Sequence, residues 1–587
     1  MHTDTLSPVT ASDVQPVLRV RHLSVTFDTY KGPVQVLHDV SFDIARGEIL
    51  GVVGESGAGK SMTGSAVTGL IEAPGRISGG TVELFGERID TLTGEDLRRI
   101  RGKRIGTIFQ DPLTSLNPVY TVGRHLVETI RTHLDVSEKE AEARALALLE
   151  EVEIPHAKAR MHQYPHQFSG GMRQRVAIAL ALCAEPELII ADEPTTALDV
   201  SVQAQIIALL RRVCKERGAA AMLITHDMGV IAETADRVMV MYHGKVLETG
   251  PVRQVLDAPS QAYTQVLMAA IPSVHQRVQR LPVPEVGEDK VAPAVPWTPK
   301  TGAADADGAS AKPLLEVKDL CKDYDLSSGW LARLLAREEK KILKAVNQVS
   351  FSIRKGTTFG LVGESGSGKS TVARMVAGLT PPTSGSIWFD GVEKWSPAAQ
   401  TVAMRRRFQM IFQDPYASLN PRWTVEALIA EPLTVLGITA SKEETAERVQ
   451  QALRRVRMKP DDAKKYPHQF SGGQRQRIAV ARALASQPEF IICDEPTSAL
   501  DVSVQAQVLN LMRDLQDEFG LTYLLISHNL AVIRHMCDDI GVMQRGRLVE
   551  VGDAQAVLDA PQHAYTRELM AAIPDIAHVH VHVHVHG

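Results

Sequence analysis

The stretch GESGAGKS at Gly54–Ser61 follows the short apolar run EILGVV at Glu48–Val53, and these two segments decide the fold. A short run rich in β-branched residues and bounded by glycines is typical of a buried strand in a parallel sheet. The glycines of a GxxxxGK[ST] loop let successive backbone N–H groups converge on a phosphate, and the helix that follows offers its positive end. We therefore expect a strand, a phosphate-binding loop and a helix, in this order.

The same loop returns as GESGSGKS at Gly363–Ser370, and it is one of six motifs that recur in the same order. The others are FQDP, YPHQFSGG, DEPT, ALDVSVQAQ and LDAP, each about 300 residues after its first copy. A period of this length corresponds to a whole domain, whereas solenoid repeats have periods of about 20–50 residues. The chain of 587 residues is therefore predicted to be a duplication of two similar halves.

Composition restricts the class of protein. The chain has 64 Lys+Arg and 69 Asp+Glu, a net charge of −5, whereas proteins that neutralise nucleic-acid phosphates usually carry a basic excess. Its 44% of hydrophobic residues fits a globular protein, yet the longest apolar runs are too short to cross a bilayer. No secretory signal is recognised at the start. Five cysteines without a CxxC pair favour a reducing compartment, so we expect a cytosolic protein that contacts no lipid directly.

Each half is expected to be an α/β domain with two lobes. Leu188–Ala191 (LIIA) and Ala221–Thr225 (AMLIT) are further short apolar runs, and each is followed by a polar residue, Asp192 or His226. Polar residues at the carboxyl ends of parallel strands place a site along that edge of the sheet. Residues 118–165 instead carry Ala and Leu at helical spacing, with charged residues opposite. This pattern predicts an inserted helical lobe.

Four side chains in each half are candidates for phosphate chemistry. The loop lysine would bridge the β- and γ-phosphates, the next serine would bind Mg²⁺, the aspartate ending the apolar strand would hold the same ion, and the following glutamate would polarise the attacking water. The alternative, a helix-capping acidic pair, is disfavoured because both halves place the pair identically. In chain order these residues are Lys60, Ser61, Asp192 and Glu193, then Lys369, Ser370, Asp494 and Glu495.

The segments YPHQFSGGMRQR (164–175) and YPHQFSGGQRQR (466–477) resemble the signature of ATP-binding cassette (ABC) proteins. A Ser-Gly-Gly turn that opens a helix exposes backbone donors, so it can bind phosphate by itself. Both halves also contain the other ATPase elements of this family. These are the loops at Gln110 and Gln413, the ALD loops ending at Asp199 and Asp501, and the histidines His226 and His528.

The resemblance implies two tandem P-loop NTPase domains, each with a RecA-like parallel-sheet core, an antiparallel β subdomain and an inserted helical subdomain. It also implies that the halves close head to tail, with one ATP between the phosphate loop of each half and the SGG turn of the other. The nucleotide-binding residues implied are Gly54, Glu55, Ser56, Gly57, Gly59, Lys60, Ser61 and Met62 with Ser471, Gly472, Gly473 and Gln474 at one site, and Gly363, Glu364, Ser365, Gly366, Gly368, Lys369, Ser370 and Thr371 with Ser169, Gly170, Gly171 and Met172 at the other.

Catalytic roles follow from the same resemblance. The implied catalytic residues are Glu193, Glu495, His226, His528, Gln110 and Gln413, and the implied metal ligands are Ser61, Gln110, Asp192, Ser370, Gln413 and Asp494. Because the glutamate and the histidine are intact in both halves, we expect two hydrolytic sites. Phe27 and Tyr324, about thirty positions before each loop, are candidates to stack on adenine, although either could pack in the core as a strand residue.

Two positions depart from the family pattern. Met172 stands where the signature usually has Gln, which removes a hydrogen-bonding side chain but leaves the backbone donors of Gly170 and Gly171. Met62 replaces a Thr next to Ser61, outside the Mg²⁺-binding position.

The stretches LDAPSQAYTQVLMAAIP (256–272) and LDAPQHAYTRELMAAIP (558–574) resemble the C-terminal stretch of ATPases that power import of oligopeptides, dipeptides, nickel and related solutes. The resemblance implies ATP and Mg²⁺ as cofactors and two transmembrane permease subunits that dock beside Gln110 and Gln413. It also implies an extracytoplasmic binding protein, no nucleic acid, and a peripheral location at the cytoplasmic face of the inner membrane, held through the permeases only.

Some relatives carry a cysteine-rich extension for an iron–sulfur cluster, but residues 273–313 contain no cysteine, so no cluster is expected. The alternative function is that of a soluble tandem ABC ATPase of the translation-factor type. Such proteins tend to have a long charged helical linker, whereas this one is rich in Pro and Ala.

We expect five segments: an N-terminal tail (1–16), a first ATPase domain with the family's C-terminal extension (17–272), a linker (273–313), a second such domain (314–576) and a His/Val tail (577–587). The composition of the linker predicts a semi-extended chain around its prolines. The tail alternates His and Val, a spacing that could chelate Ni²⁺, Cu²⁺ or Zn²⁺; the alternative is a plain disordered terminus.

Overall fold

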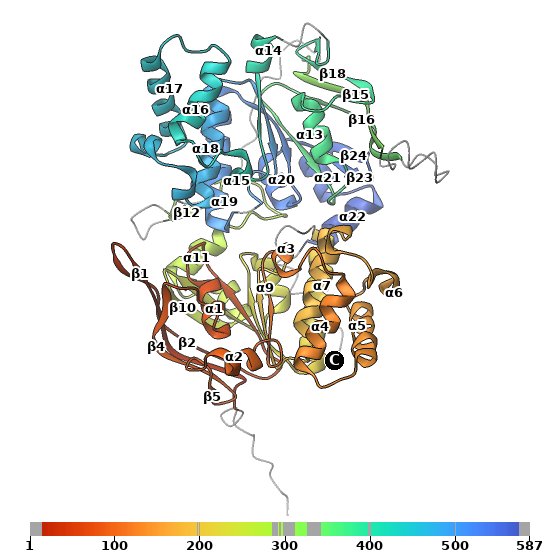
Figure 1. The fold of residues 1–587 in the computed structure, drawn as a ribbon. Helices are drawn as coiled ribbons and strands as arrows, with labels where there is room; N and C mark the ends of the chain where they lie inside the picture. The colour runs from red at the N-terminus through yellow and green to blue at the C-terminus, as the bar shows by residue number, and fades with distance from the viewer. Residues whose placement is uncertain are drawn as a thin grey trace, which may run out of the picture. The chain divides into compact units, whose positions relative to one another are not determined.

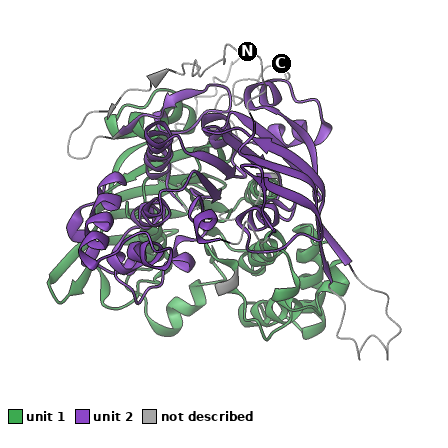
Figure 2. Ribbon diagram, turned by 90° about the horizontal axis from the view of Figure 1, so that it is seen from above, with its two compact units in different colours: residues 1–198, 202–268, 574–587 green, residues 199–201, 269–573 purple. Residues whose placement is uncertain are grey.

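The computed structural model describes residues 15–195, 198, 200–284, 291–292, 295–296, 312–325, 342–396, 401–498 and 500–573. The chain divides into two compact units (Figure 2). Unit 1 comprises residues 1–198, 202–268 and 574–587, and unit 2 comprises residues 199–201 and 269–573. The predicted His/Val tail at 577–587 lies outside the described residues, as does most of the predicted N-terminal tail.

Unit 1 is built on a six-stranded sheet whose strands are parallel except for one edge strand. Its central strands are almost entirely buried, which explains why their sequences are continuous apolar runs. The strands expected at 48–53, 188–191 and 221–225 are present within one residue. In spatial order the sheet comprises β10 (Lys245–Pro251), β9 (Arg237–Tyr242), β3 (Ile49–Val53), β8 (Ala220–Ile224), β7 (Leu188–Asp192) and β6 (Ile105–Ile108).

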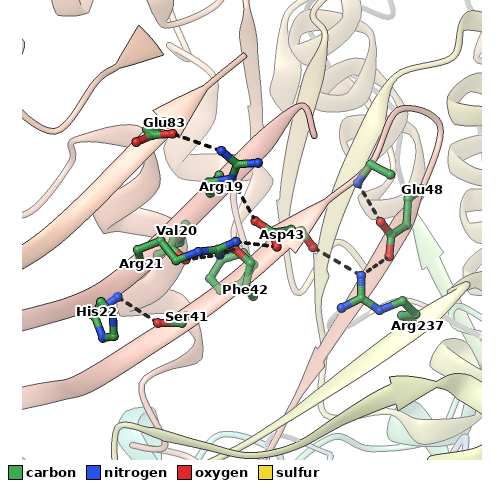
Figure 3. Close-up of polar contacts among 11 residues, drawn as sticks. Arg19, Val20, Arg21, His22, Ser41, Phe42, Asp43, Glu48, Glu83 and Arg237 are labelled. Atoms are coloured by element: carbon green, nitrogen blue, oxygen red, sulfur yellow. Dashed lines mark hydrogen bonds and ion pairs between the residues drawn. The ribbon is translucent and has the colours of Figure 1, made fainter. Parts of the chain in front are cut away.

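A four-stranded antiparallel sheet forms the second layer of unit 1, in the order β2 (Gly32–Ile44), β1 (Leu18–Thr29), β4 (Gly75–Leu84) and β5 (Glu87–Arg88). A polar network joins it to the core sheet (Figure 3). Arg21 pairs with Asp43 at 2.7 Å, while Arg237 donates to the Asp43 carbonyl and pairs with Glu48 at 2.9 Å. Since Arg237 opens β9, these contacts fix the end of β2 to the core sheet.

The helices of unit 1 include the predicted helical lobe. Helices α4 and α5 belong to that lobe, and α7, which follows it, lies beside them (Figure 1). The side chains of Thr121 and Ser137 cap α4 and α5 by accepting backbone N–H bonds. In chain order the helices are α1 (Lys60–Thr68), α2 (Gly94–Ile100), α3 (Pro112–Ser115), α4 (Val122–His133), α5 (Glu138–Glu151), α6 (Ala157–Arg160), α7 (Gly170–Leu182), α8 (Val200–Arg217), α9 (Met228–Thr234), α10 (Val252–Asp257) and α11 (Ala262–Ala269).

Unit 2 repeats this architecture. Its core sheet has the order β20 (Phe408–Ile411), β21 (Phe490–Asp494), β22 (Thr522–Ile526), β17 (Thr358–Val362), β23 (Asp539–Gln544) and β24 (Arg547–Asp553), with β24 antiparallel. Its antiparallel sheet has the order β16 (Ile342–Ile353), β15 (Leu315–Asp325), β18 (Ser384–Phe389) and β19 (Val392–Glu393). The duplication and the α/β fold predicted from the sequence are confirmed.

The helices of unit 2 follow the same plan. They are α13 (Lys369–Ala377), α14 (Val402–Arg406), α15 (Pro415–Ser418), α16 (Val425–Val435), α17 (Lys442–Arg455), α18 (Gly472–Ala485), α19 (Val502–Phe519), α20 (Leu530–Met536), α21 (Ala554–Asp559) and α22 (Ala564–Ala571). Across the described ranges of both units, none of the helices is both long and apolar enough to cross a bilayer.

The beginning of the expected linker belongs to unit 2. Short strands β11 (Val278–Arg280) and β12 (Val283–Pro284) pair antiparallel with β14 (Val295–Pro296) and β13 (Val291–Ala292). The strand β12 lies beside α19 (Figure 1). This part of the chain is therefore packed on a domain, a feature that its Pro/Ala composition does not reveal.

Candidate nucleotide-binding sites

The phosphate loop of unit 1 connects β3 to α1 and requires its glycines. Gly54 has φ 146°, and a Cβ atom there would lie 2.2 Å from the Met241 carbonyl oxygen. The side chain of Lys60 crosses the loop, and its Nζ donates to the carbonyl oxygens of Gly54 (2.8 Å) and Glu55 (2.9 Å). Lys60 is only 6% exposed. The loop therefore holds a buried cation beside the start of a helix, which is the chemistry of an anion site.

A carboxyl and a hydroxyl group meet at the carboxyl end of β7. Ser61 Oγ donates to Asp192 Oδ1 at 3.0 Å. Burial raises the pKa of Asp192 and the neighbouring Glu193 raises it further, although the Ser61 hydrogen bond and the Lys60 charge act in the opposite direction. The pKa of Asp192 is raised overall, so the surroundings disfavour the ionised carboxylate. A bound divalent cation would favour the ionised form.

The carboxylate of Glu193 is held from two sides. Gln110 Nε2 donates to Glu193 Oε2 at 2.8 Å, and His226 Nδ1 lies 3.3 Å from Glu193 Oε1. The backbone of Glu193 is left-handed, with φ 48°, and its N–H donates to the Ile224 carbonyl at 2.8 Å. Such a conformation is unfavourable for a residue with a side chain and persists only where the surroundings enforce it. Here the end of β8 enforces it and aims the carboxylate at Gln110 and His226.

Unit 2 contains the same cluster. Lys369 Nζ donates to the carbonyl oxygens of Gly363 (2.7 Å) and Glu364 (2.8 Å), and Ser370 Oγ donates to Asp494 Oδ1 at 3.1 Å. Gln413 Nε2 and His528 Nδ1 lie 2.9 and 3.2 Å from Glu495 Oε2, and Glu495 has φ 47°.

The two carboxylates of unit 2 titrate in opposite directions. Burial raises the pKa of Asp494. Burial also acts to raise the pKa of Glu495, but the hydrogen bond and charge of His528, the charge of Lys369 and the Gln413 hydrogen bond outweigh it. The pKa of Glu495 is therefore lowered, so this carboxylate stays ionised and able to accept a proton.

The signature turns open α7 and α18 and differ in their capping. Ser169 Oγ accepts from the Met172 N–H at 3.3 Å, and Ser471 Oγ accepts from the Gln474 N–H at 3.4 Å. Gln474 Oε1 also accepts from the Ser471 N–H at 3.1 Å, which completes a reciprocal capping box. Met172 cannot make the second bond, since a thioether is a poor acceptor. The substitution noted in the sequence therefore changes the capping of one turn only.

Within each unit the structure brings together the predicted lysine, serine, aspartate, glutamate, glutamine and histidine. Asp199 lies outside the described residues, whereas Asp501 immediately precedes α19. The pairing of each SGG turn with the phosphate loop of the other half stays a prediction, as do the two hydrolytic sites.

The two candidate adenine-stacking residues differ in their surroundings. The Phe27 ring lies against Gly75, and it is partly buried against the hydrophobic core of unit 1. Tyr324 is 37% exposed, with Lys322 Nζ 5.4 Å from the centre of its ring. Phe27 therefore packs as a strand residue, which was the alternative left open, and stacking of either ring on adenine stays a prediction.

One pair of tyrosines contacts the phosphate loops and was not predicted from the sequence. The hydroxyl of Tyr263, on α11, accepts from the phosphate-loop N–H of Glu55 at 3.2 Å. The hydroxyl of Tyr565, on α22, accepts from the N–H of Glu364 at 3.0 Å. Both tyrosines belong to the repeated AYT triplet in the LDAP stretches, and that repetition was the available signal.

The fold and these clusters define a tandem P-loop ATPase. The ABC transporter family model matches residues 37–196 and 346–498. The model for the oligopeptide/dipeptide transporter C-terminal region matches residues 247–290 and 549–584. The chain belongs to the ABC transporter family.

Curated relatives agree with these matches. The glutathione import ATP-binding protein GsiA of Escherichia coli K12 is 45% identical over 586 residues, which cover 98% of this chain and 91% of that protein. The protein of the same name from Shigella flexneri is 44% identical over 586 residues, with the same coverage. Because the C-terminal region of peptide transporters occurs in both halves, the chain is an ATP-binding ATPase subunit of an importer for peptides or related small solutes. The translation-factor alternative is not favoured.

Solved structures with similarity to this chain include ABC cassettes. The dimeric post-hydrolysis state of the ATP-binding cassette MJ0796 bound to ADP and Pi is 29% identical, covers 41% of this chain and 98% of its own, and has a TM-score of 0.36. The structure of cbiO1 from Clostridium perfringens, part of the ABC transporter complex cbiONQ, is 26% identical, covers 46% of this chain and 98% of its own, and has a TM-score of 0.37.

Proposed function

We propose that this chain powers the import of small peptides, with a tripeptide of the size of glutathione as the first candidate solute. Two observations support the solute class: the peptide-transporter region present in both halves and the glutathione-import name carried by relatives 45% identical over nearly the whole chain. The observation that carries the ATPase mechanism is the Gln–Glu–His cluster found in each unit.

In the proposed cycle, ATP binds to the phosphate loop of one half and to the SGG turn of the other, and it holds the two halves closed. Glu193 and Glu495 each accept a proton from the attacking water. The lowered pKa of Glu495 keeps its carboxylate ionised for this role. Gln110 and Gln413 orient that water, while His226 and His528 contact the γ-phosphate. Hydrolysis removes the ATP that holds the two halves together. The halves then open, so the protein alternates between a closed and an open state.

The residues at the carboxyl ends of β7 and β21 fit a magnesium ion. Hydroxyl and carboxylate oxygens are the ligands that Mg²⁺ prefers, and they lie 3.0 Å apart at Ser61 and Asp192 and 3.1 Å apart at Ser370 and Asp494. Gln110 and Gln413 would add an amide oxygen. When bound, Mg²⁺ would neutralise the negative charge of the β- and γ-phosphates.

Exposed aromatic side chains beside each Gln loop support docking of permease subunits. In unit 1 a cavity of about 520 Å³ extends from Ser61 and Asp192 to Phe109, with a lining of mixed polar and apolar residues. Phe109 directly precedes Gln110 and is 44% exposed. In unit 2 Tyr416 and Trp423, just after Gln413, are 63% and 40% exposed. We propose that each half receives a coupling helix from one of two permeases, since exposed aromatic patches are typical of protein interfaces.

This arrangement would place the chain at the cytoplasmic face of the inner membrane, attached through its permeases, with an extracytoplasmic binding protein delivering the solute. The test is to co-express the chain with its neighbouring permease and binding-protein genes and to measure uptake of labelled glutathione and of a labelled dipeptide. We expect ATP-dependent uptake that is lost in the double variant Lys60→Ala, Lys369→Ala. Purification of the chain with ribosomes and without permeases would contradict the proposal.

A further inference from the structure

Residues 277–284, here called the strap, are attached to unit 2 by two arginines. Arg280 forms ion pairs with Asp514 at 2.9 Å and Asp517 at 2.7 Å, both on α19. Arg277 pairs with Asp538, which follows α20, at 3.2 Å. The side chain of Arg277 is only 6% exposed, and that of Arg280 is 22% exposed. Their aspartate partners are 28–35% exposed, so salt screens these ion pairs less than fully exposed pairs.

A backbone clamp adds to these ion pairs. The N–H of Leu281 donates to Asn510 Oδ1 at 2.9 Å, and its carbonyl accepts from Asn510 Nδ2 at 2.8 Å. Leu281 and Asn510 are 4% and 6% exposed. One side chain of α19 therefore satisfies both backbone groups of a buried strap residue, in the way that a neighbouring strand would.

The corresponding helix of unit 1 lacks this surface. In the aligned repeats VSVQAQ (200–205 and 502–507), Asn510, Asp514 and Asp517 correspond to Ala208, Arg212 and Lys215. The clamp is therefore missing from α8, and the charges that would face the strap arginines are reversed. Because like charges repel, α8 could not bind the strap.

The two units also differ in the cation that pairs with an aspartate present in both, Asp236 in unit 1 and Asp538 in unit 2. In unit 1 Asp236 is paired with Lys215 from α8 at 2.9 Å. In unit 2 the corresponding aspartate, Asp538, is paired with Arg277 from the strap. The strap thus supplies the cation that the neighbouring helix supplies in unit 1.

We infer that the surface formed by α19 and the end of α20 is a docking surface for the strap, and that the strap shortens the connection between the two units. Nine residue steps separate Met268, where unit 1 ends in this part of the chain, from Arg277, whereas 46 separate it from Leu314, just before β15. The effective concentration of one tethered module near another falls roughly as the −3/2 power of tether length. Release of the strap should therefore lower the effective concentration of one unit near the other about tenfold.

The docking claim is tested by hydrogen–deuterium exchange of the full-length chain. We expect slow exchange at the Leu281 amide, and exchange at least about 30-fold faster in the variant Arg277→Glu, Arg280→Glu, because each new carboxylate faces an aspartate. The control variant Lys442→Glu, Lys464→Glu makes the same total charge change at two exposed lysines of unit 2 that take part in none of these contacts, and it should leave the exchange rate unchanged. The swap Arg280→Glu, Asp517→Arg restores one pair and should slow exchange again relative to Arg280→Glu alone.

Fast exchange at Leu281 in the unmodified chain, or equal rates in the lysine control variant and in the double arginine variant, would overturn the docking surface. The consequence for the tether rests on the proposed function, and it has a separate readout. ATP turnover at half-saturating ATP should fall by up to about tenfold in the double variant, since closure of the halves becomes less frequent, and it should be higher in the swap than in Arg280→Glu alone. Unchanged turnover together with accelerated exchange would leave the docking surface established and refute the shortened tether.

Discussion

In unit 1 the Gln110 amide lies 2.8 Å from Glu193, and in unit 2 the Gln413 amide lies 2.9 Å from Glu495. The serine–aspartate distances, 3.0 and 3.1 Å, agree as closely. The helices that follow do not agree, because α8 presents Arg212 and Lys215 where α19 presents two aspartates. The two copies are therefore alike at the phosphate site, where both need the same chemistry, and they differ on the surface of the following helix.

The strongest test of this comparison is to remove one catalytic carboxylate at a time. Glu193→Gln and Glu495→Gln keep the hydrogen bond to the neighbouring glutamine possible but abolish the proton acceptor. General-base catalysis contributes about 10²–10⁴-fold, so turnover at the substituted site should fall at least about 100-fold in either variant. Single-turnover hydrolysis of radiolabelled ATP, measured in each variant and in the double variant, separates the two sites.

Equal losses of turnover in the two single variants would show that the two sites hydrolyse ATP equally. If either single variant leaves steady-state turnover unchanged, the site concerned does not hydrolyse ATP and the expectation of two active sites is wrong. Nucleotide binding serves as the control, because the substitution removes no ligand of the phosphates.

A second test concerns a residue that differs between the two units. Unit 2 has His535 at the position where unit 1 has Glu233. Burial lowers the pKa of His535 to about 3, and the charges of Arg513 on α19 and of Arg277 and Arg280 on the strap act in the same direction. Asp538 is the acidic group that also contacts Arg277. The Val278 backbone on the strap acts in the opposite direction, but it is the smallest of these effects. The docked strap therefore requires a neutral ring.

Because the pKa is lowered in the docked state and returns towards about 6.5 when the ring is exposed, acid favours release. Protection of the Leu281 amide should be constant above pH 7 and weaken by up to about tenfold per pH unit below about 6.5. Hydrogen exchange between pH 5.5 and 7.5, corrected for intrinsic rates, measures this, and His535→Asn should abolish the dependence. Constant protection over the whole range would contradict it.

The strands, the phosphate loops and the acidic pairs could be predicted because each is encoded locally. LIIAD at 188–192 is recognisable as a buried strand ending in a carboxylate without any knowledge of its neighbours. The strap could not be predicted, since its contacts join Arg277 and Arg280 to residues more than 230 positions later. Its Pro/Ala-rich surroundings carry no hydrophobic period, and charge complementarity becomes visible only when the helix is in place.

A third test addresses the signature turns, where Ser471 has a complete capping box and Ser169 has not. Gln474→Met should loosen the turn of α18, and Met172→Gln should complete the box at α7. One reciprocal hydrogen bond is worth about 1 kcal/mol, so we expect turnover to change about fivefold at the site that uses the substituted turn. Measuring each variant in the background of Glu193→Gln or Glu495→Gln assigns the effect to one site. An identical effect in both backgrounds would show that the capping box does not act locally.

The smallest effect is expected at the tyrosines that contact the phosphate loops. Tyr263→Phe and Tyr565→Phe keep the ring but leave the N–H of Glu55 or Glu364 without its acceptor. Loss of a neutral hydrogen bond of this kind corresponds to about a threefold effect, which we expect in the KM for ATP and not in kcat, because the hydroxyl positions the start of the loop and touches no reacting group.

The matched control is Tyr242→Phe, since the centres of the Tyr242 and Tyr263 rings are 4.3 Å apart. ATPase kinetics should show the same rise in KM for the two loop variants and none for the control. A rise confined to one half would mean that the C-terminal helices, like the helices α8 and α19, have diverged in role. A fall in kcat at constant KM would instead place the tyrosine hydroxyl in the hydrolytic step.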